Sequence, residues 1–324
     1  MIKALAAKSA NKKLEPFEYE ESIGANDVLV SVEVCGVCHS DIHLADGDWG
    51  DVFPLVPGHE VIGTVKQFGE SVNGFEIGQR VGVGWQCDSC NDCEYCKDGK
   101  ETFCLKNQPT CMGHHGGFAD EVVANERFVI PVPDALGSAE AAPLLCGGVT
   151  VYTPIDMYAK PGDHVAVVGI GGLGHLALQI AKAKGCKVTA ISTSADKEEM
   201  ARQFGADEFV TEPAANSYDL ILNTAHVVLP MGDYIKALRG GGTFVQLGVP
   251  AEPFCIEDIT SMFDGNKKIA GSGIGHPHKI KELLELAAEH NIAAQVQVMP
   301  MGEVNEAMDI TRQNKARFRV VLKN

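Results

Sequence analysis

The sequence lacks long apolar runs and is poor in basic residues. Nowhere in its 324 residues do about 18 apolar residues run together, so we expect no membrane-spanning helix and no membrane partner. Lys and Arg number 27 against 43 Asp and Glu, which gives a formal charge of −16. Because this charge would repel a phosphate backbone, nucleic acid is not an expected partner.

The first residues of the sequence do not have the pattern expected of a secretory leader. Apolar runs there are short and are broken by Lys3 and Lys8, so we expect a cytoplasmic protein. In that compartment the eleven cysteines should be reduced thiols, and clustered ones are candidates for metal binding before disulfides. Five cysteines stand outside the clusters described below, and most of them are interpreted as buried apolar side chains: Cys35, Cys87, Cys111, Cys186 and Cys255.

The chain length and a change of pattern predict two domains. Up to about residue 145, short β-like runs separated by Gly, Pro and Asp predict an all-β part. The runs are 28–34, 60–68, 80–83 and 118–123. From about residue 162, strands alternate with helices, which predicts a doubly wound parallel sheet of six strands.

The expected strands of that sheet are 164–168, 187–192, 208–210, 219–223, 243–247 and 268–271, with helices at 173–184, 196–204 and 231–238. Two further helices, 279–289 and 302–313, and a strand at 318–322 follow the complete sheet. We expect this last part to return to the first domain. The predicted division is therefore 1–147, 148–275 and 276–324.

One Gly- and Asp-rich stretch of fifteen residues contains four cysteines: Cys90, Cys93, Cys96 and Cys104. Four thiolates close a tetrahedral shell around zinc and leave no position for water, so this lobe, about residues 87–105, predicts a structural zinc. An iron–sulfur cluster is the alternative, but the proline that follows bacterial ferredoxin runs is missing. Another alternative is a zinc site formed by Cys87, Cys90, Cys93 and Cys96, without Cys104.

A dispersed set of Cys38, His59 and Cys146 could hold a second zinc. Two sulfurs and one imidazole leave a fourth position open, as a catalytic zinc requires, and this Cys₂His composition is a known one for alcohol dehydrogenase. Taken singly, such residues are more often part of a core than metal ligands.

A glycine-rich turn, Gly169-Ile170-Gly171-Gly172-Leu173-Gly174, follows an apolar strand and opens a helix. Glycines let the backbone approach a pyrophosphate, whose charge then lies at the helix N-terminus. This context predicts nucleotide binding.

These motifs together resemble the medium-chain zinc alcohol dehydrogenases. The segment Gly58-His59-Glu60-x2-Gly63-x5-Gly69-x2-Val72 resembles that family's zinc signature. Together with Cys38-His39-Ser40-Asp41-x-His43 and Leu144-Leu145-Cys146, the chain is most similar to the cinnamyl alcohol dehydrogenase and NADP-dependent aldehyde reductase branch. The resemblance covers nearly the whole chain.

The resemblance implies a GroES-like, β-rich catalytic domain, a Rossmann domain and two zinc ions per chain. It assigns Cys38, His59 and Cys146 to the catalytic zinc, and the four lobe cysteines to the structural one. Glu60 would be a nearby carboxylate that can approach the catalytic metal when substrate or water leaves, or a hydrogen-bonded structural acid. Asp41 would accept the other ring N–H of His59.

For the reaction, the resemblance implies hydride transfer between NADP(H) and a small alcohol or aldehyde, either aromatic or medium-chain. Ser40 would pass a proton through the cofactor ribose to His43. His39 and Thr150 would contact the cofactor, and Trp49 would line the substrate pocket. Related proteins suggest a homodimer formed through the nucleotide domain.

Two segments are shorter than the family pattern. Residues 105–116, near the expected pocket mouth, are fewer than in close relatives, which leaves the substrate range open. Residues 211–218 are too few for a crossover that carries a helix, so we expect an extended connection there.

Two other functions are consistent with much of the sequence. A zinc-free quinone or enone reductase of the same superfold would not need Cys38, His59 and Cys146, and metal analysis would identify it. A non-catalytic NADPH-binding protein could retain the fold, because fold alone does not prove function. An assay with NADPH and an aromatic aldehyde would separate that function from an enzyme.

The choice of cofactor depends on the end of the second sheet strand. NAD-specific sites place Asp or Glu about 20 residues after the glycine turn, where the acid binds the ribose 2′-OH. This chain instead has Ser192, Thr193 and Ser194, followed by Lys197. Hydroxyls and a cation suit a 2′-phosphate, so NADP(H) is predicted. Alternatively, the hydroxyls cap a helix and Asp196 serves NAD.

We therefore predict that the protein uses NADPH in strong preference to NADH, and that Ser192→Asp weakens this preference because the new carboxylate repels the 2′-phosphate. The measurement is kcat/KM for both cofactors with one aldehyde. Equal or better use of NADH by the parent protein would contradict the assignment.

Overall fold

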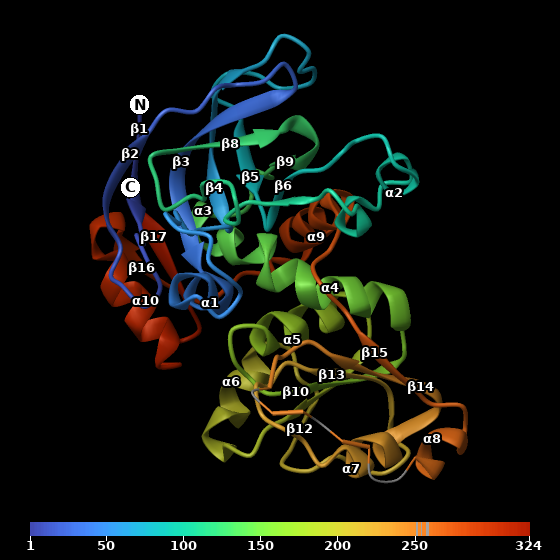
Figure 1. The fold of residues 1–324 in the computed structure, drawn as a ribbon. Helices are drawn as coiled ribbons and strands as arrows, with labels where there is room; N and C mark the ends of the chain where they lie inside the picture. Colours follow the sequence, from blue (N-terminus) through green and yellow to red (C-terminus); the bar gives the residue numbers. More distant parts are fainter. Residues whose placement is uncertain (251, 254, 257–258) are drawn as a thin grey trace. The chain divides into compact units, whose positions relative to one another are not determined.

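The computed structural model describes residues 1–250, 252–253, 255–256 and 259–324, and these form two units. One unit contains Met1–Cys146 and His276–Asn324, and the other contains Gly147–Gly275. The chain therefore forms most of the first unit, then the whole second unit, and then returns to the first unit. The colour order along the chain in Figure 1 shows this path. In the described ranges, no helix has both the length and the apolar character needed to cross a membrane.

The first unit is built on a seven-stranded sheet with β3 (Asp27–Val37) near its centre. On one side β3 pairs antiparallel with β17 (Arg319–Lys323), which comes from the returning part of the chain. The remaining strands of this sheet are β4 (Val61–Phe68), β5 (Arg80–Val83), β8 (Glu121–Asn125), β9 (Val129–Pro131) and β16 (Val296–Pro300). Two small antiparallel pairs complete the strands of the unit: β1 (Ile2–Ala6) with β2 (Glu15–Tyr19), and β6 (Gln86–Asp88) with β7 (Gln108–Pro109).

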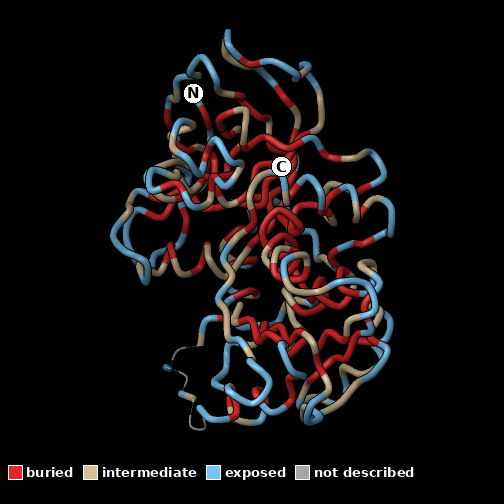
Figure 2. Tube along the Cα trace, turned by 90° about the vertical axis from the view of Figure 1, so that its right-hand side faces the viewer, coloured by how far each residue is buried: buried red, intermediate tan, exposed pale blue. Residues whose placement is uncertain are grey.

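Burial explains why β3 holds this central position. Val28, Val30 and Cys35 are fully buried, and most other residues of β3 are buried too, with Glu33 its one exposed residue. Figure 2 shows the buried trace running through the interior of each unit while loops stay exposed. Residues that directly follow β3 therefore begin from a rigid position.

The second unit is a six-stranded parallel sheet in the order β12-β11-β10-β13-β14-β15. The order reverses between β10 and β13, and doubly wound sheets bind ligands beside such a reversal. The predicted α/β fold class is confirmed. The strands are β10 (His164–Val168), β11 (Lys187–Ile191), β12 (Glu208–Val210), β13 (Tyr218–Asn223), β14 (Leu238–Gln246) and β15 (Lys268–Gly271).

Helices connect and cover these sheets. In the first unit they are α1 (His39–Asp46), α2 (Glu94–Lys97), α3 (Ser138–Ala141), α9 (Pro277–His290) and α10 (Val304–Arg312). In the second they are α4 (Gly147–Tyr158), α5 (Gly174–Ala183), α6 (Glu198–Gln203), α7 (Met231–Ala237) and α8 (Thr260–Phe263). Short 3₁₀ helices cover Glu101–Phe103, Glu126–Phe128, Ala142–Leu145, Ala195–Lys197 and Met301–Glu303.

Several predicted elements need correction. The first part is not all-β, because α1 follows β3 directly. The strand expected at 118–123 begins only at Glu121, since Phe118 instead bonds the backbone of Leu5 and Pro57. The helix expected at 196–204 is split, because a 3₁₀ turn precedes α6. The expected lack of a helix in 211–218 is confirmed, and Tyr218 is already the first residue of β13.

The glycine turn between β10 and α5 is closely packed. Gly169 has φ 85°, in the region that favours glycine. A Cβ on Gly174 would lie 1.9 Å from the carbonyl oxygen of Gly169, a backbone atom that cannot rotate away. A Cβ on Gly171 would meet no described atom within 4 Å.

We predict that Gly174→Ala destabilises the protein by about 1–3 kcal/mol, because the methyl group overpacks the turn. Urea unfolding without cofactor measures the change. Gly171→Ala is the matched control and should unfold as the parent does. Equal stability of both variants would show that the turn has room for a side chain at Gly174.

Candidate functional site

A cluster of potential metal ligands is buried in the first unit. The potential ligand atoms of Cys38, His59, Glu60 and Cys146 all lie within 4.8 Å of one another. Cys38 ends β3 and is the N-cap of α1, His59 lies just before β4, and Cys146 follows a 3₁₀ helix. Three separate segments thus bring together the dispersed set that the sequence suggested.

Asp41 orients the histidine of this cluster. Its carboxylate lies 3.0 Å from Nδ1 of His59 and accepts backbone N–H bonds from Cys38 and Gly58 at 2.9 and 2.8 Å. With Nδ1 protonated and donating to Asp41, Nε2 carries the lone pair of the ring. Nε2 is buried, and no described residue bonds it. An imidazole held in this way fits a metal ligand.

The electrostatics of the two thiols also fit a cation. Sγ of Cys38 and Sγ of Cys146 are 4.0 Å apart, and Cys146 is buried while Cys38 is partly buried. A hydrogen bond from the Cys146 thiol lowers the pKa of Cys38 well below its ordinary value, and the same contact with burial raises the pKa of Cys146. Two thiolates so close in a buried site need a positive charge between them.

The same neighbours raise the pKa of the histidine. Burial alone would lower the pKa of His59, but the charges of Asp41 and Cys146 raise it well above the ordinary value. A bound cation would replace that proton with a metal–nitrogen bond, since metal ligands must be deprotonated. The cluster is therefore charge-balanced either by a proton or by a metal ion.

Glu60 has a partner that the sequence analysis missed. Its carboxylate forms a buried ion pair with Arg319 of β17. Burial raises the pKa of Glu60 to about 7, although the charge of Arg319 opposes the rise. A Cβ on Gly36 would lie 2.0 Å from Oε2 of Glu60, so only glycine leaves room for this carboxylate. Nothing in the sequence around Arg319 indicates that this arginine pairs with Glu60.

Cys111 is a second residue that was missed. It is fully buried, and its sulfur lies within 4.8 Å of ligand atoms of both Asp41 and His59. Burial raises its pKa to about 11, so it is a neutral thiol packed beside the histidine. Its burial agrees with the interpretation as a buried apolar side chain, but its chain position gives no hint that it lies beside His59.

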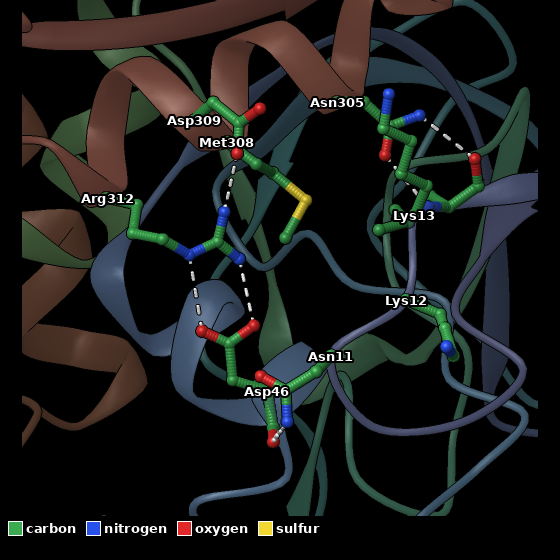
Figure 3. A pocket seen from close by; sticks show the side chains of 9 residues that line it. Asn11, Lys12, Lys13, Asp46, Asn305, Met308, Asp309 and Arg312 are labelled. Carbon is green, nitrogen blue, oxygen red and sulfur yellow. Dashed lines mark hydrogen bonds and ion pairs between the residues drawn. The ribbon is translucent and has the colours of Figure 1, made fainter.

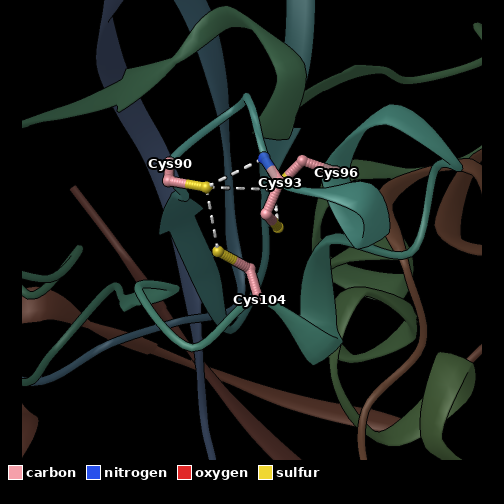
Figure 4. A group of neighbouring side chains, drawn as sticks. All are labelled: Cys90, Cys93, Cys96 and Cys104. Carbon is pink, nitrogen blue, oxygen red and sulfur yellow. Dashed lines mark hydrogen bonds between the residues drawn. The ribbon is translucent and has the colours of Figure 1, made fainter.

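The four lobe cysteines form a separate group, shown in Figure 4. Cys90 and Cys104 have their sulfurs 3.5 Å apart, as have Cys93 and Cys96. Backbone N–H groups of Asp92 and Cys93 lower the pKa of Cys90 to about 6, which favours the thiolate that binds zinc. Cys87 stands outside this group, and its thiol donates to the carbonyl of Gln108.

The candidate proton-relay residues lie on α1. Ser40 and His43 are three residues apart and share a helix face. The hydroxyl of Ser40 lies 3.7 Å from the sulfur of Cys38, and Nδ1 of His43 lies 2.8 Å from Asp48. His39 is the first residue of α1.

Two tryptophans connect this helix to the metal cluster. The ring of Trp49 stacks on His43 with centroids 5.2 Å apart and meets Trp85 edge-on at 6.1 Å. Trp85 in turn packs edge-on against His59 at 4.8 Å. Trp49 is 41% exposed, so it forms a partly open wall. Trp85 was missed by the sequence analysis, because a lone tryptophan is usually packing.

In the second unit, the hydroxyl-rich segment lies beside the glycine turn. Ser192 follows β11 directly, and its hydroxyl accepts the backbone N–H of Ser194. Nζ of Lys197 donates to the carbonyl oxygen of Ile170 at 3.1 Å, so this cation lies against the turn. Asp196 is exposed in the 3₁₀ turn. The remaining residues proposed for the cofactor are placed on the turn, on this segment or on α4: Gly172, Leu173, Thr193 and Thr150.

Comparisons with known proteins agree with both units. Residues 24–134 match the alcohol dehydrogenase GroES-like domain, and residues 172–289 match the zinc-binding dehydrogenase family. The aldehyde reductase AdhA of Synechocystis is 41% identical, with 99% of this chain and 98% of that protein covered. A probable mannitol dehydrogenase of Fragaria ananassa is 40% identical, with 98% and 93% covered.

Two solved structures share the fold over nearly the whole chain. A cinnamyl alcohol dehydrogenase of Sorghum bicolor gives a TM-score of 0.93 at 37% identity, and covers 99% of this chain and 97% of its own. A cinnamyl alcohol dehydrogenase of Helicobacter pylori, complexed with NADP(H), gives 0.91 at 32% identity with the same coverage.

We predict that the parent protein binds two zinc ions and that single variants remove them separately. Cys93→Ser should lose one ion and lower the melting temperature by about 5 °C or more, because the lobe then has no closed shell. Cys146→Ser should lose the other ion with little change in melting. Metal analysis and thermal unfolding measure both. A Cys93→Ser variant that melts as the parent does would contradict a structural role for the lobe.

Proposed function

Because this chain belongs to the medium-chain zinc-binding alcohol dehydrogenase family, in the cinnamyl alcohol dehydrogenase and aldehyde reductase branch, we propose that it reduces aldehydes with NADPH. The reverse reaction is the oxidation of a primary alcohol. The observation that carries the proposal is the orientation of His59. Its Nδ1 lies against Asp41, and its Nε2 is buried beside two thiols without a bond from any described residue.

In this proposal Cys38, His59 and Cys146 hold the catalytic zinc, and the four lobe cysteines hold the structural zinc. When bound, a zinc with one open position polarises a carbonyl oxygen as a Lewis acid. Glu60 stays paired with Arg319 beside the metal ligands, which keeps its charge from competing with the thiolates. Asp41 keeps the imidazole in the tautomer that binds metal.

The proton that the product alcohol needs is supplied along α1. Ser40 lies nearest the thiols and holds the proton at its hydroxyl, and His43 exchanges protons with solvent because its side chain is 39% exposed. Asp48 bonds Nδ1 of His43, which leaves Nε2 free to take up and release the proton. A relay is required because the ligand cluster itself is buried from bulk water.

The cofactor is proposed to bind at the switch point of the parallel sheet. Gly171 leaves the backbone open to a pyrophosphate at the start of α5, while Gly169 and Gly174 allow the tight, closely packed turn. Ser192, Thr193, Ser194 and Lys197 are proposed to bind the 2′-phosphate of NADP(H), supported by the contact of Lys197 with the turn. His39 and Thr150 are proposed to contact the cofactor as well.

The substrate is proposed to be a small alcohol or aldehyde, bound against the rings of Trp49 and Trp85, which meet edge-on. Flat aromatic aldehydes suit such a wall, because aromatic pairs stack or meet edge-on. A steady-state assay with NADPH and a panel of aromatic and aliphatic aldehydes tests this. Turnover of none of them by the zinc-loaded protein would contradict the proposed function.

We also propose a homodimer formed through the nucleotide unit, and a cytoplasmic location. The edge strand β15 has one unpaired side among the described strands, which a second copy could complete. Reduced thiols are required at both metal groups, which favours a reducing compartment. Sedimentation measurements of the zinc-loaded protein test the dimer.

We predict that Ser40→Ala lowers kcat by about two to four orders of magnitude, because a positioned proton transfer is removed while the metal ligands stay in place. The zinc content should not change. Steady-state kinetics across pH, with metal analysis of the same samples, check this. A near-normal kcat at every pH would exclude Ser40 from the mechanism.

A further inference from the structure

The C-terminal end of α1 is held by residues far from the metal cluster. Helix ends leave carbonyl groups without partners in the helix. Here Asn11 supplies two donors: its backbone N–H bonds the carbonyl of Ala45, and its side-chain amide bonds the carbonyl of Asp46, both at 3.0 Å. Asn11 has φ 59°, which allows both bonds from one residue.

Arg312 of α10 holds the same end through the side chain of Asp46. Its Nη2 and Nε lie 2.8 and 3.3 Å from the two carboxylate oxygens, and its Nη1 lies 2.7 Å from Asp309. A two-pronged contact of this kind fixes orientation as well as distance. We call Asn11, Asp46 and Arg312 the α1 anchor.

The loop that carries Asn11 is itself tied to α10. The side-chain amide of Asn305 accepts the backbone N–H of Leu14 at 2.8 Å and donates to the carbonyl of Leu14 at 3.0 Å. Both ends of α10 therefore act on α1, Asn305 through the loop and Arg312 directly. Figure 3 shows these two groups on either side of Met308.

The residues of the α1 anchor are not closely packed, so their polar contacts are what fix this end of the helix. The residues of the α1 anchor and the adjoining loop line a cavity of about 250 Å³, with Leu14 and Met308 as its apolar members. The inner face of α1 is well packed, since Leu44 and Ala45 are fully buried. Loss of the α1 anchor should therefore leave the helix in place but loosen its last turn.

That last turn carries His43. The carbonyl of His43 accepts the backbone N–H of Asp48, and the side chain of Asp48 bonds the His43 ring. The start of α1 is tied to the metal ligands through Asp41. The position of His43 relative to those ligands thus depends on whether the far end of the helix is also fixed.

We propose that Asn11 and Arg312 are positioning residues for proton transfer, which hold His43 in the relay without touching any reactant. This inference rests on the proposed function of His43. Small displacements of a catalytic group by distant changes can reduce rates strongly. The α1 anchor thus positions a relay residue from outside the expected site.

The test uses the zinc-loaded full-length protein, with Arg312→Ala and Asn11→Gly as the main variants. Glycine keeps the positive φ and the backbone N–H of position 11, so only the side-chain amide is removed. Each variant should lower kcat about 3- to 30-fold, with zinc content and the KM values for aldehyde and NADPH unchanged. Arg239→Ala, which breaks an ion pair of similar exposure in the second unit, is the matched control and should keep the parent kcat.

Two readouts separate positioning from general destabilisation. Added N-ethylmorpholine buffer, whose protonated form is an external acid, should raise kcat of aldehyde reduction for Arg312→Ala and Asn11→Gly but not for the parent, because it supplies the proton in place of a displaced His43. Asp46→Ala combined with Arg312→Ala should be no slower than the slower single variant, since both remove one contact. Loss of kcat without a response to the amine, or additive losses in the double variant, would overturn the inference.

His43→Ala separates this inference from the proposed function. If His43→Ala is slow and responds to the amine while both main variants behave as the parent, the α1 anchor has no positioning role. If His43→Ala itself retains the parent kcat, the proposed relay through His43 is wrong. The inference is then also wrong, because the α1 anchor would have no relay residue to position.

Discussion

The buried carboxylate of Asp41 is the interaction on which the site depends. It bonds the backbone at Cys38, the backbone at Gly58 and the ring of His59, so it joins the start of α1 to the segment before β4. A buried carboxylate needs such partners, because its desolvation is costly when it is unpaired. Asp41 therefore fixes the positions of two candidate metal ligands, Cys38 and His59, relative to the first turn of α1.

Much of this arrangement could be predicted from the sequence. The six parallel strands and the glycine turn follow from apolar runs and from residues that only certain backbone positions accept. The ligand candidates were found because metal-binding residue types recur in known spacings. The sequence analysis placed Asp41 beside His59 by resemblance, and the structure brings them within 3.0 Å.

The rest depends on contacts between distant segments. Helix α1 was missed because its N-cap is Cys38, not one of the usual capping residues, and its eight residues are too few for a clear period. Arg319 and Cys111 reach the cluster only through pairing of β17 with β3 and through the loop before β8. Neither position has a local pattern that separates it from ordinary core residues.

The pairing of β17 with β3 has a consequence for the newly made chain. Residues 276–324 are synthesised after the whole nucleotide unit. The central strand β3 therefore lacks its partner β17 while the second unit is synthesised. During that interval β3 has an open edge and Glu60 has no arginine beside it. Essentially the whole chain must therefore leave the ribosome before the first unit can be completed, and the unpaired edge of β3 exposes the nascent first unit to aggregation until then.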